Sequence, residues 1–493
     1  TGHQLALSLQ TTPFKPVAFV DDNPKLKGSL VAGLKVHRPK QLMPLAKELS
    51  AKKVLLALGN APRSERMTVI KKLEPLAISV QTIPDLSDVL SGKAKIEDIK
   101  DVEIDDLLGR DTVTPKEELL HACITNKVVM VTGAGGSIGS ELCRQILHQK
   151  PTHLILLELN EYNLYKIEQE LQKTLKTFQE TIELVSLLGS VQNRGRLESI
   201  MSTFAVQTIY HAAAYKHVPL VEHNIVEGVS NNVFGTWHCA EAAIKAGVES
   251  FVLVSTDKAV RPTNIMGASK RVAELVLQGL TERQSTTRFS MVRFGNVLGS
   301  SGSVVPLFRE QIKHGGSITV THPDILRYFM TIPEAAELVI QAGSMGEGGD
   351  VFVLDMGEPL KIIDLAKRMI RLSGLEVKDD QHPNGDIEIL FTGLRPGEKL
   401  YEELLIGNNI SGTNHARILR AEETSLGWVD IQRLLTALEE ACETFNCHLV
   451  SNILMSAPSG YEVKNQTLID FVWNTQETKK NQKKIIKFKQ ITP

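Results

Sequence analysis

The most constraining feature of this sequence is a run of apolar residues that passes directly into a glycine-rich turn and then into a helical pattern. The run is Val128–Thr132, the turn is Gly133–Gly139, and an apolar periodicity typical of a helix continues to Leu147. Glycines after a buried strand let the backbone turn tightly, and the following helix offers free N–H groups at its N-terminus. This order predicts a parallel α/β sheet with an anion-binding turn at its edge.

The next predicted strand, His153–Glu158, supports a dinucleotide site. A carboxylate about 20 residues after the turn can bind the adenosine ribose hydroxyls and repel a 2′-phosphate, which favours NAD over NADP. A strand from Thr208 ends in small residues that leave room for a cofactor over the sheet edge. The residues expected to bind the cofactor are Gly133, Gly135, Gly136, Ser137, Ile138, Gly139, Glu158, Ala212, Ala213 and Ala214.

Composition excludes several classes of protein. The 493 residues are 42% hydrophobic and 23% charged, which is ordinary for a soluble globular chain of about three domains. The net charge of -2 gives no global field that would attract nucleic acid or anionic lipid. Five cysteines without a CxxC pair indicate reduced thiols in a cytosolic compartment, and no metal site is expected.

Strand and helix patterns alternate from the start of the chain, so we expect two Rossmann-like doubly wound parallel-sheet units and a smaller α/β substrate-binding lobe. The predicted domains are a truncated N-terminal Rossmann-like domain at 1–92, a connector at 93–125, an NAD-binding catalytic Rossmann domain at 126–300, a substrate-binding lobe at 301–427 that shares elements with the catalytic domain, and a C-terminal helix with a basic tail at 428–493.

The N-terminal region looks like the second part of a βαβ unit. It has a helical pattern at Leu5–Leu9, strands at Val17–Asp22 and Val54–Gly59, and a helix through Arg66 to Leu73. The chain starts at Thr1 without methionine, so we expect a piece of a longer protein.

A second group of polar residues follows the buried strand Phe251–Ser255, which brings Thr256, Asp257 and Lys258 to the carboxyl edge of the sheet. Neighbouring opposite charges under a cofactor can be tuned toward a neutral pKa. The alternative is a plain surface salt bridge. On the helix that follows, Met266 and Lys270 are four residues apart and share one face.

The string Ser255–Arg271 resembles the extended short-chain dehydrogenase/reductase superfamily. Within it, the chain is similar to the membrane-anchored, configuration-retaining UDP-N-acetylglucosamine 4,6-dehydratases of the capsular polysaccharide biosynthesis protein family. Further matching segments are His211–Glu222, Arg293–Gly299 and Gly393–Lys399. The resemblance covers roughly residues 15–430.

The resemblance implies an enzyme that oxidises the sugar at C4 with bound NAD, eliminates water across C5–C6 and returns the hydride to C6. It implies that Asp257 is the acid, Lys258 the base, Thr256 the partner of the C4 oxygen, and Lys270 the holder of the nicotinamide ribose. It also implies that Ser190 and Val191 line the adenine site, although relatives usually carry Asp at the first of these.

Met266 departs from the superfamily, which normally has Tyr four residues before the lysine. A thioether cannot accept the C4 hydroxyl proton. Among the dehydratases this departure resembles the long branch that retains the C5 configuration. Our hypothesis is that Asp257 takes over the C4 proton transfer, directly or through water.

The substrate expected from the resemblance is UDP-N-acetylglucosamine, for bacterial surface polysaccharide. Residues at matching substrate positions are Lys216, Asn232, Asn296, Arg327, Arg395 and Glu398. Two alternatives stay open: a UDP-sugar 4-epimerase or reductase on the same fold, and a catalytically silent NAD-binding scaffold.

We expect a homo-oligomer at the cytoplasmic face of the bacterial inner membrane, held there by a segment absent from this sequence. We expect no nucleic-acid partner. The basic stretch Lys479–Lys487 is more typical of a solvated end than of a membrane or nucleic-acid contact.

Overall fold

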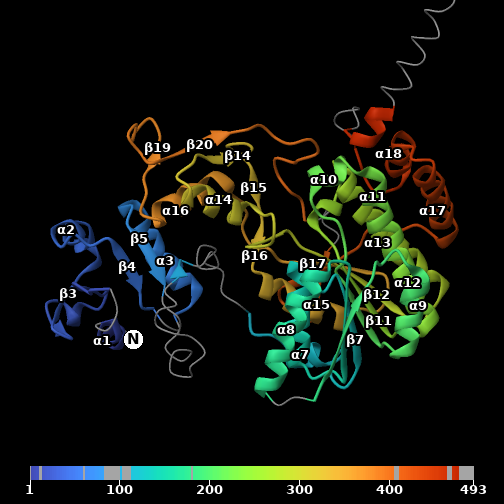
Figure 1. The fold of residues 1–493 in the computed structure, drawn as a ribbon, viewed down its shortest axis with the longest axis horizontal. Helices are drawn as coiled ribbons and strands as arrows, with labels where there is room; N and C mark the ends of the chain where they lie inside the picture. The colour runs from blue at the N-terminus through green and yellow to red at the C-terminus, as the bar shows by residue number, and fades with distance from the viewer. Residues whose placement is uncertain are drawn as a thin grey trace, which may run out of the picture. The chain divides into compact units, whose positions relative to one another are not determined.

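A computed structural model describes residues 2–9, 14–58, 61–82, 100–102, 113–178, 181–404, 410–462 and 469–476. The chain divides into two compact units (Figure 1). One unit contains Thr1–Thr112, Gly302–Ile325 and Leu360–Gly393, and the other contains Val113–Ser301, Leu326–Pro359 and Leu394–Pro493. The domain boundaries proposed above stay predictions. The basic stretch Lys479–Lys487 and most of the connector lie outside the described residues.

The second unit is built on a nine-stranded sheet in the order β21-β22-β17-β12-β11-β10-β7-β8-β9. The parallel strands are β7 (Val128–Thr132), β8 (His153–Glu158), β9 (Glu183–Leu188), β10 (Thr208–His211), β11 (Ser250–Val254), β12 (Arg288–Arg293) and β17 (Asp350–Leu354). The antiparallel strands are β22 (Ile418–Ala421) and β21 (Ile410–Gly412). The strand order reverses between β7 and β10, which is the switch point where open α/β sheets bind ligands.

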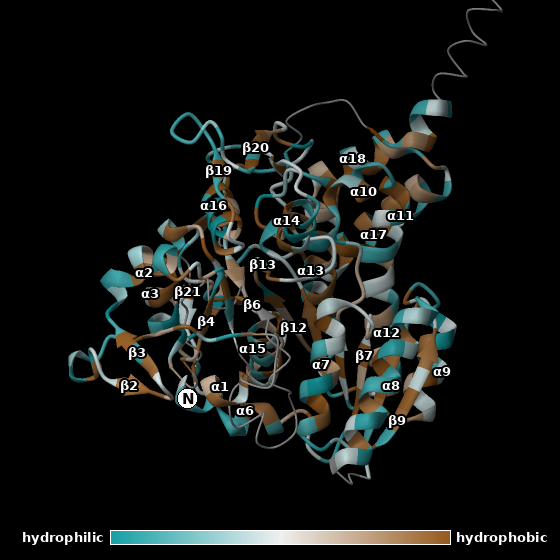
Figure 2. Cartoon of the chain, turned by 60° about the vertical axis from the view of Figure 1, so that its left-hand side comes forward, coloured by the Kyte–Doolittle hydropathy of each residue, from teal (hydrophilic) through white to brown (hydrophobic). Residues whose placement is uncertain are grey.

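Helices cover both faces of this sheet. One face carries α6 (Glu117–His121), α7 (Ser137–His148), α8 (Glu161–Phe178) and α15 (Ile332–Met345). The other carries α9 (Arg194–Thr203), α11 (Ile225–Val229), α12 (Gly235–Ala246), α13 (Ile265–Arg283), α17 (Trp428–Glu443) and α18 (Cys447–Ser456). Because strand side chains alternate, Phe251 and Leu253 enter one core while Val252 enters the other. Figure 2 shows hydrophilic residues along α7 and α8 beside the hydrophobic strands.

Shorter elements connect these layers in the second unit. They are α10 (Val218–Glu222), the π-helical segment η4 (Ser230–Phe234), the 3-10 turn η5 (Asp257–Ala259), and the strands β13 (Asn296–Val297), β15 (Leu326–Arg327) and β16 (Phe329–Met330). Helix α13 begins where the Asn264 side chain accepts a hydrogen bond from Gly267 N at 2.8 Å. That cap fixes the start of the helix that carries Met266 and Lys270.

The described residues of the first unit form three small sheets. Their strands are β1 (Phe19–Val20), β2 (Leu30–Val31) and β3 (Leu34–His37); β4 (Lys53–Leu56), β5 (Ser79–Thr82) and β6 (Lys100–Asp101); and β14 (Ile318–Val320), β19 (Val377–Lys378) and β20 (Ile387–Phe391). Its longer helices are α1 (Gly2–Leu9), α2 (Leu42–Glu48), α3 (Arg63–Leu73), α14 (Val304–Lys313) and α16 (Ile362–Leu372), and the strand β18 (Leu360–Lys361) precedes α16.

The predicted α/β class with parallel strands is confirmed. The strands predicted at Val128–Thr132 and His153–Glu158 have those bounds in the structure. Among the described residues, no helix combines the length and apolarity that crossing a bilayer requires.

Candidate active site

The glycine turn between β7 and α7 is too tight for side chains. A Cβ at Gly139 would lie 2.0 Å from the Gly133 carbonyl oxygen, and one at Gly133 would lie 2.8 Å from Ala213 Cα. Gly133 also has a φ of +66°, which favours glycine. The turn therefore brings the backbones of β7, α7 and the small residues after β10 together.

Glu158 lies at the end of β8, next to this turn. Its Oε2 accepts a hydrogen bond from Gly135 N at 2.9 Å, and its Oε1 accepts from the backbone N–H groups of Leu159 and Asn160, each at 2.9 Å. The N-cap of α7 is Gly136, and no side chain caps this helix end. A carboxylate beside an uncovered helix N-terminus is the arrangement that a dinucleotide needs for its ribose and pyrophosphate.

Two buried basic groups lie along the same edge. Lys270 is 4% exposed, and its Nζ donates to the Val254 carbonyl at 2.8 Å. Burial lowers the pKa of Lys270 to about 8. His211 lies between the hydroxyl groups of Thr132 (2.8 Å) and Thr236 (3.2 Å), and burial, followed by the charge of Lys270, lowers its pKa to about 3. His211 is therefore neutral at physiological pH and acts as a hydrogen-bonding residue.

The strongest feature of the site is the ion pair of Asp257 and Lys258 in η5, directly after β11. Lys258 Nζ lies 2.9 Å from Asp257 Oδ1, and the hydroxyl of Thr256 donates to the same oxygen at 2.9 Å. Asp257 is 1% exposed, and its backbone N–H donates to the Phe294 carbonyl. Its Oδ2 is buried and has no hydrogen-bond partner among the described residues. The pair is therefore not a surface salt bridge.

Lys258 is surrounded by further polar groups. Its Nζ lies 3.3 Å from Asn296 Oδ1 and 3.8 Å from Glu402 Oε1. Burial alone would lower the pKa of Lys258, but the charges of Asp257 and Glu402 more than offset it, so the pKa is raised. The sequence-based expectation of a pKa tuned toward neutrality is therefore not met for Lys258 in this arrangement.

Glu402 is a site residue that sequence reasoning missed. It is 8% exposed, and burial raises its pKa, with the Lys258 charge opposing this rise. In the sequence it is the first of two adjacent glutamates, a pattern typical of a solvated surface. Its only signal is its position three residues after the segment Gly393–Lys399.

Two arginines are expected to bind the diphosphate: Arg327 in β15 and Arg395 in the segment Gly393–Lys399. Arg327 is 7% exposed, lies 3.3 Å from Glu398 Oε1 and 3.8 Å from Glu402 Oε1, and also donates to the Lys399 carbonyl at 2.8 Å. Arg395 is exposed, and its backbone N–H donates to Glu398 Oε2 at 3.0 Å. Arg327 thus lies beside the carboxylates of Glu398 and Glu402, and Glu402 also lies beside Lys258. The Arg395 side chain lies at the surface.

Met266 and Asn232 are buried, as Asp257 is. Met266 is 2% exposed within the hydrophobic cluster on the α13 face. Asn232, in the π-helical η4, is fully buried: its Oδ1 accepts from Tyr215 N at 2.8 Å, and its Nδ2 donates to Ser269 Oγ at 3.1 Å. Asn232 therefore positions the loop after β10 against α13, and a π-helical turn is often found at functional positions.

Ser137 and Ile138 form the first turn of α7, while Lys216, Ser190 and Val191 lie on two loops. Lys216 is exposed, and partial desolvation and the charge of Lys258 lower its pKa. Ser190 Oγ accepts from Gln192 N at 3.1 Å, and Val191 is 4% exposed. Lys216 is therefore electrostatically coupled to the ion pair, while Ser190 and Val191 shape the loop after β9.

A buried ion network supports the turn η5, which carries Asp257 and Lys258, through Ser255 at the end of β11. Glu274 of α13 accepts from Ser255 Oγ at 2.6 Å and pairs with Arg293 at 2.5 Å and Arg271 at 3.0 Å. Both arginines also pair with Glu423. Burial opposes ionisation of Glu274, but the charges and hydrogen bonds of Arg293 and Arg271, with the Ser255 hydroxyl, together outweigh it and lower the pKa of Glu274 to about 2. This network joins β11, α13, β12 and the segment before α17.

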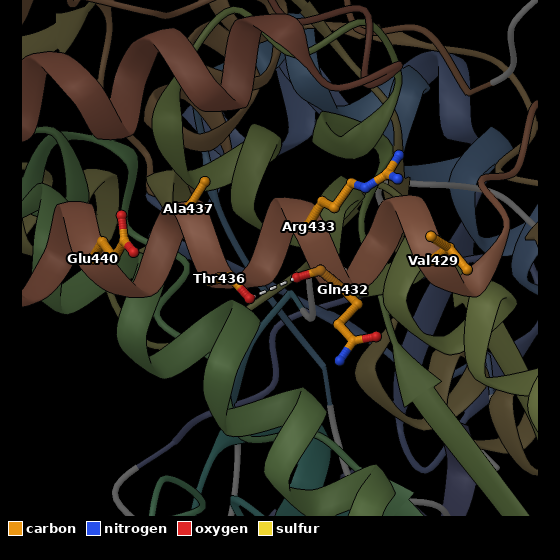
Figure 3. Close-up of a pocket in the computed structure, with 6 residues that line it drawn as sticks. All are labelled: Val429, Gln432, Arg433, Thr436, Ala437 and Glu440. Atoms are coloured by element: carbon orange, nitrogen blue, oxygen red, sulfur yellow. Dashed lines mark hydrogen bonds between the residues drawn. The ribbon is translucent and has the colours of Figure 1, made fainter.

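Elsewhere, a surface hollow lies along α17, lined by Val429, Gln432, Arg433, Thr436, Ala437 and Glu440 (Figure 3). All six side chains come from one helix, and none belongs to the predicted site. In the described part of the chain, no group of three or more His, Cys, Asp or Glu side chains could hold a metal ion.

Comparison with known proteins identifies the family. The model of the family described as "Polysaccharide biosynthesis protein" matches residues 129–423, which include most of the site. The chain belongs to this polysaccharide biosynthesis family. It is 48% identical, over 82% of its length, to the capsular polysaccharide biosynthesis protein CapD of Staphylococcus aureus. The match covers 66% of CapD, so the chain spans just under two thirds of that relative.

Solved structures of similar fold extend the comparison. The X-ray structure of Pen from Bacillus thuringiensis is 31% identical, with a TM-score of 0.54, and covers 64% of this chain and 99% of its own. The dTDP-glucose 4,6-dehydratase DesIV of Streptomyces venezuelae, solved with NAD bound, is 22% identical with a TM-score of 0.48, and covers 56% of this chain and 88% of its own. The match to Pen, which covers nearly all of that protein, shows that the α/β fold of this chain recurs in a solved structure.

Proposed function

We propose that this chain is an NAD-dependent lyase that converts UDP-N-acetylglucosamine to UDP-2-acetamido-2,6-dideoxy-4-hexulose with retention at C5. The observation that carries the proposal is the ion pair of the buried Asp257 with the partly buried Lys258 at the carboxyl end of β11. Elimination across C5–C6 needs an acid and a base side by side, whereas a hydride transfer alone does not. The similarity to CapD supports a role in bacterial surface polysaccharide synthesis.

The residues around the glycine turn fit NAD. The turn and the N-terminus of α7 would hold the pyrophosphate, Glu158 the adenosine ribose, Ser190 and Val191 the adenine, and Lys270 the nicotinamide ribose. When bound there, NAD would supply the hydride chemistry of the reaction.

The proton transfers fall to the chain's own residues. Thr256 hydrogen-bonds the C4 oxygen, and Asp257 accepts the C4 hydroxyl proton because Met266 cannot. Lys258 then takes the proton from C5 while the C6–O bond breaks, and the hydroxyl leaves as water with the proton from Asp257. Lys258 returns a proton to the same face of C5, which retains the configuration.

The substrate nucleotide would lie against the residues grouped near Glu398. Arg327 suits the diphosphate because a guanidinium pairs with two phosphate oxygens at once. Lys216, Asn232, Asn296 and Arg395 complete the proposed set, with Asn232 acting through the loop after β10. We also propose, from the resemblance, a homo-oligomer at the cytoplasmic face of the bacterial inner membrane, which fractionation and light scattering of the native protein would test.

The test is incubation of the purified chain with UDP-N-acetylglucosamine, with product analysis by mass spectrometry and NMR. We expect a 4-keto-6-deoxy sugar nucleotide without consumption of added NADH. A C4 epimer as the product would instead indicate an epimerase, and unchanged substrate in the presence of NAD would indicate a silent scaffold. Either result rejects the dehydratase.

A further inference from the structure

The proposed dehydration requires a second proton acceptor in addition to Asp257, and the structure places a residue that can serve as one. This inference rests on the proposed function. Before elimination, the site must accept the C4 hydroxyl proton, and Lys258 must lose a proton to become a free amine. Asp257 can hold only one of these protons. Because Met266 replaces a proton-accepting tyrosine, a second acceptor is required beside Lys258.

Glu402 is placed to be that acceptor. Its Oε1 lies 3.8 Å from Lys258 Nζ, on a different chain segment from Asp257, so the ammonium group lies between two buried carboxylates. A movement of less than an ångström would bring the two atoms to a hydrogen-bond distance of about 3.0 Å. Within the described part of the chain, the Oε2 of Glu402 is buried and has no hydrogen-bond partner, as is true of Asp257 Oδ2.

Charged side chains from several chain segments surround Glu402 and Lys258. Asp257 faces Lys258 from η5, and Arg327 of β15 lies 3.8 Å from Glu402. The charges of Lys216, after β10, and of Lys399 also act on the cluster. Burial raises the pKa of Glu402, and its basic neighbours offset only part of this rise, so this carboxyl takes up a proton more readily than an exposed glutamate.

We propose that Glu402 is a positioning residue that stores the proton of Lys258 during dehydration. The cycle starts with Asp257 and Glu402 as carboxylates and Lys258 as the ammonium. Asp257 takes the C4 proton, and Lys258 passes a proton to Glu402; an N–H bond breaks and an O–H bond forms. Lys258 then removes the C5 proton, and Asp257 releases its proton with the C6 hydroxyl as water.

The remaining steps restore the starting charges. Lys258 gives its proton back to C5 as hydride arrives at C6, and becomes a free amine again. Glu402 then returns the stored proton to Lys258. Over one cycle the substrate loses one water molecule, and no proton is taken from or left on the protein.

The test compares the pH profiles of kcat for the wild-type chain and Glu402→Gln. Without the proton store, Lys258 must enter the reaction already deprotonated. We therefore expect Glu402→Gln to be slow at pH 7 and to gain about tenfold in kcat per pH unit as Lys258 titrates, while the wild type stays nearly flat. Glu402→Asp, which keeps the carboxyl, should restore the flat profile. A purely structural role would lower kcat by the same factor at every pH, and that result overturns the proposal.

Glu403→Gln is the matched control, because Glu403 pairs with Arg261 at 3.4 Å and not with Lys258. We expect it to keep the wild-type profile. Thermal unfolding and bound NAD content are measured for each variant, so that only folded, loaded protein is compared. A Glu402→Gln protein that keeps the wild-type profile also overturns the proposal.

A second readout does not depend on turnover. The rate at which an amine-acylating reagent labels Lys258, followed by peptide mass spectrometry over a pH series, gives the pKa of Lys258 directly. Removing the Glu402 charge should lower this pKa by about one unit. An unchanged pKa rejects the coupling, whereas a lowered pKa in a protein without dehydratase activity supports the coupling and rejects only the proposed function.

Discussion

At the scale of single residues, the proposed reaction depends on which side chains can accept or donate a proton. Asp257, Lys258 and Thr256 were predictable because a buried strand places the residues after it at the ligand edge of a parallel sheet. Glu402 was not, because its burial depends on Lys258 and Arg327, which lie far from it in the sequence. A glutamate in a polar segment carries no pattern that distinguishes burial from exposure.

Replacing Asp257 with Asn tests the acid. We expect kcat to fall by about 100- to 10,000-fold, the usual contribution of a general acid or base, because an amide cannot accept the C4 proton or release it to the C6 hydroxyl. The measurement is steady-state turnover with bound NAD quantified in the same sample. Asp324→Asn, at an exposed ion pair with Lys361, is the control and should keep wild-type turnover. Normal turnover of Asp257→Asn would remove Asp257 from the mechanism.

Gly267 offers a test of how closely α13 approaches the catalytic turn. A Cβ there would lie 2.2 Å from the Lys258 carbonyl oxygen, so Gly267→Ala must displace η5 or the helix. We expect a loss of about 1–3 kcal/mol in the free energy of unfolding, together with lower turnover. Gly412→Ala, where nothing lies within 4 Å of the added Cβ, should cost much less. Equal stability of the two variants in urea unfolding would contradict this geometry.

At the scale of elements, the strands were the most predictable part. Val128–Thr132 and His153–Glu158 are apolar runs bounded by glycine and charge, so their bounds could be predicted correctly. The ion network of Glu274, Arg293, Arg271 and Glu423 could not, since it joins elements that only the fold brings together. Charged residues are usually exposed, so a sequence gives no reason to place them in a core unless their partners are known.

Glu274 gives a pH prediction for this network. Its pKa in the folded chain is about 2, below the ordinary value of 4.5, so its charge stabilises the fold above pH 4.5 and the stabilisation disappears as the pH falls toward 2. Glu274→Gln should lose about 3–5 kcal/mol at pH 7, because Arg293 and Arg271 stay buried with less compensation. It should also show a weaker pH dependence of unfolding between pH 4.5 and 2.

Urea unfolding at a series of pH values measures both effects. Glu198→Gln is the control: Glu198 pairs with Arg194 and Lys245 on the surface, so its loss should matter far less. If the two variants are equally stable at pH 7, the ion network of Glu274 does not stabilise the fold around η5.

At the scale of the whole molecule, the residues of the candidate site lie in one of the two compact units, although they come from segments between Gly133 and Glu402. The doubly wound order of the sheet explains this, because every parallel strand delivers its carboxyl end to the same edge. The sequence predicted the dinucleotide half of this arrangement from local patterns. The segment after Gly393 needed a resemblance, because loops carry no periodicity that fixes their position.

We propose that one site oxidises C4, eliminates water and returns the same hydride to C6. UDP-N-acetylglucosamine carrying deuterium at C4 tests this sequence of steps, with the product examined by NMR and mass spectrometry. We expect a 4-keto-6-deoxy product with the deuterium in the C6 methyl group, and with the C5 configuration of the substrate. Deuterium that stays at C4, or that is lost from the sugar while a 6-deoxy product forms, would rule out the proposed dehydratase.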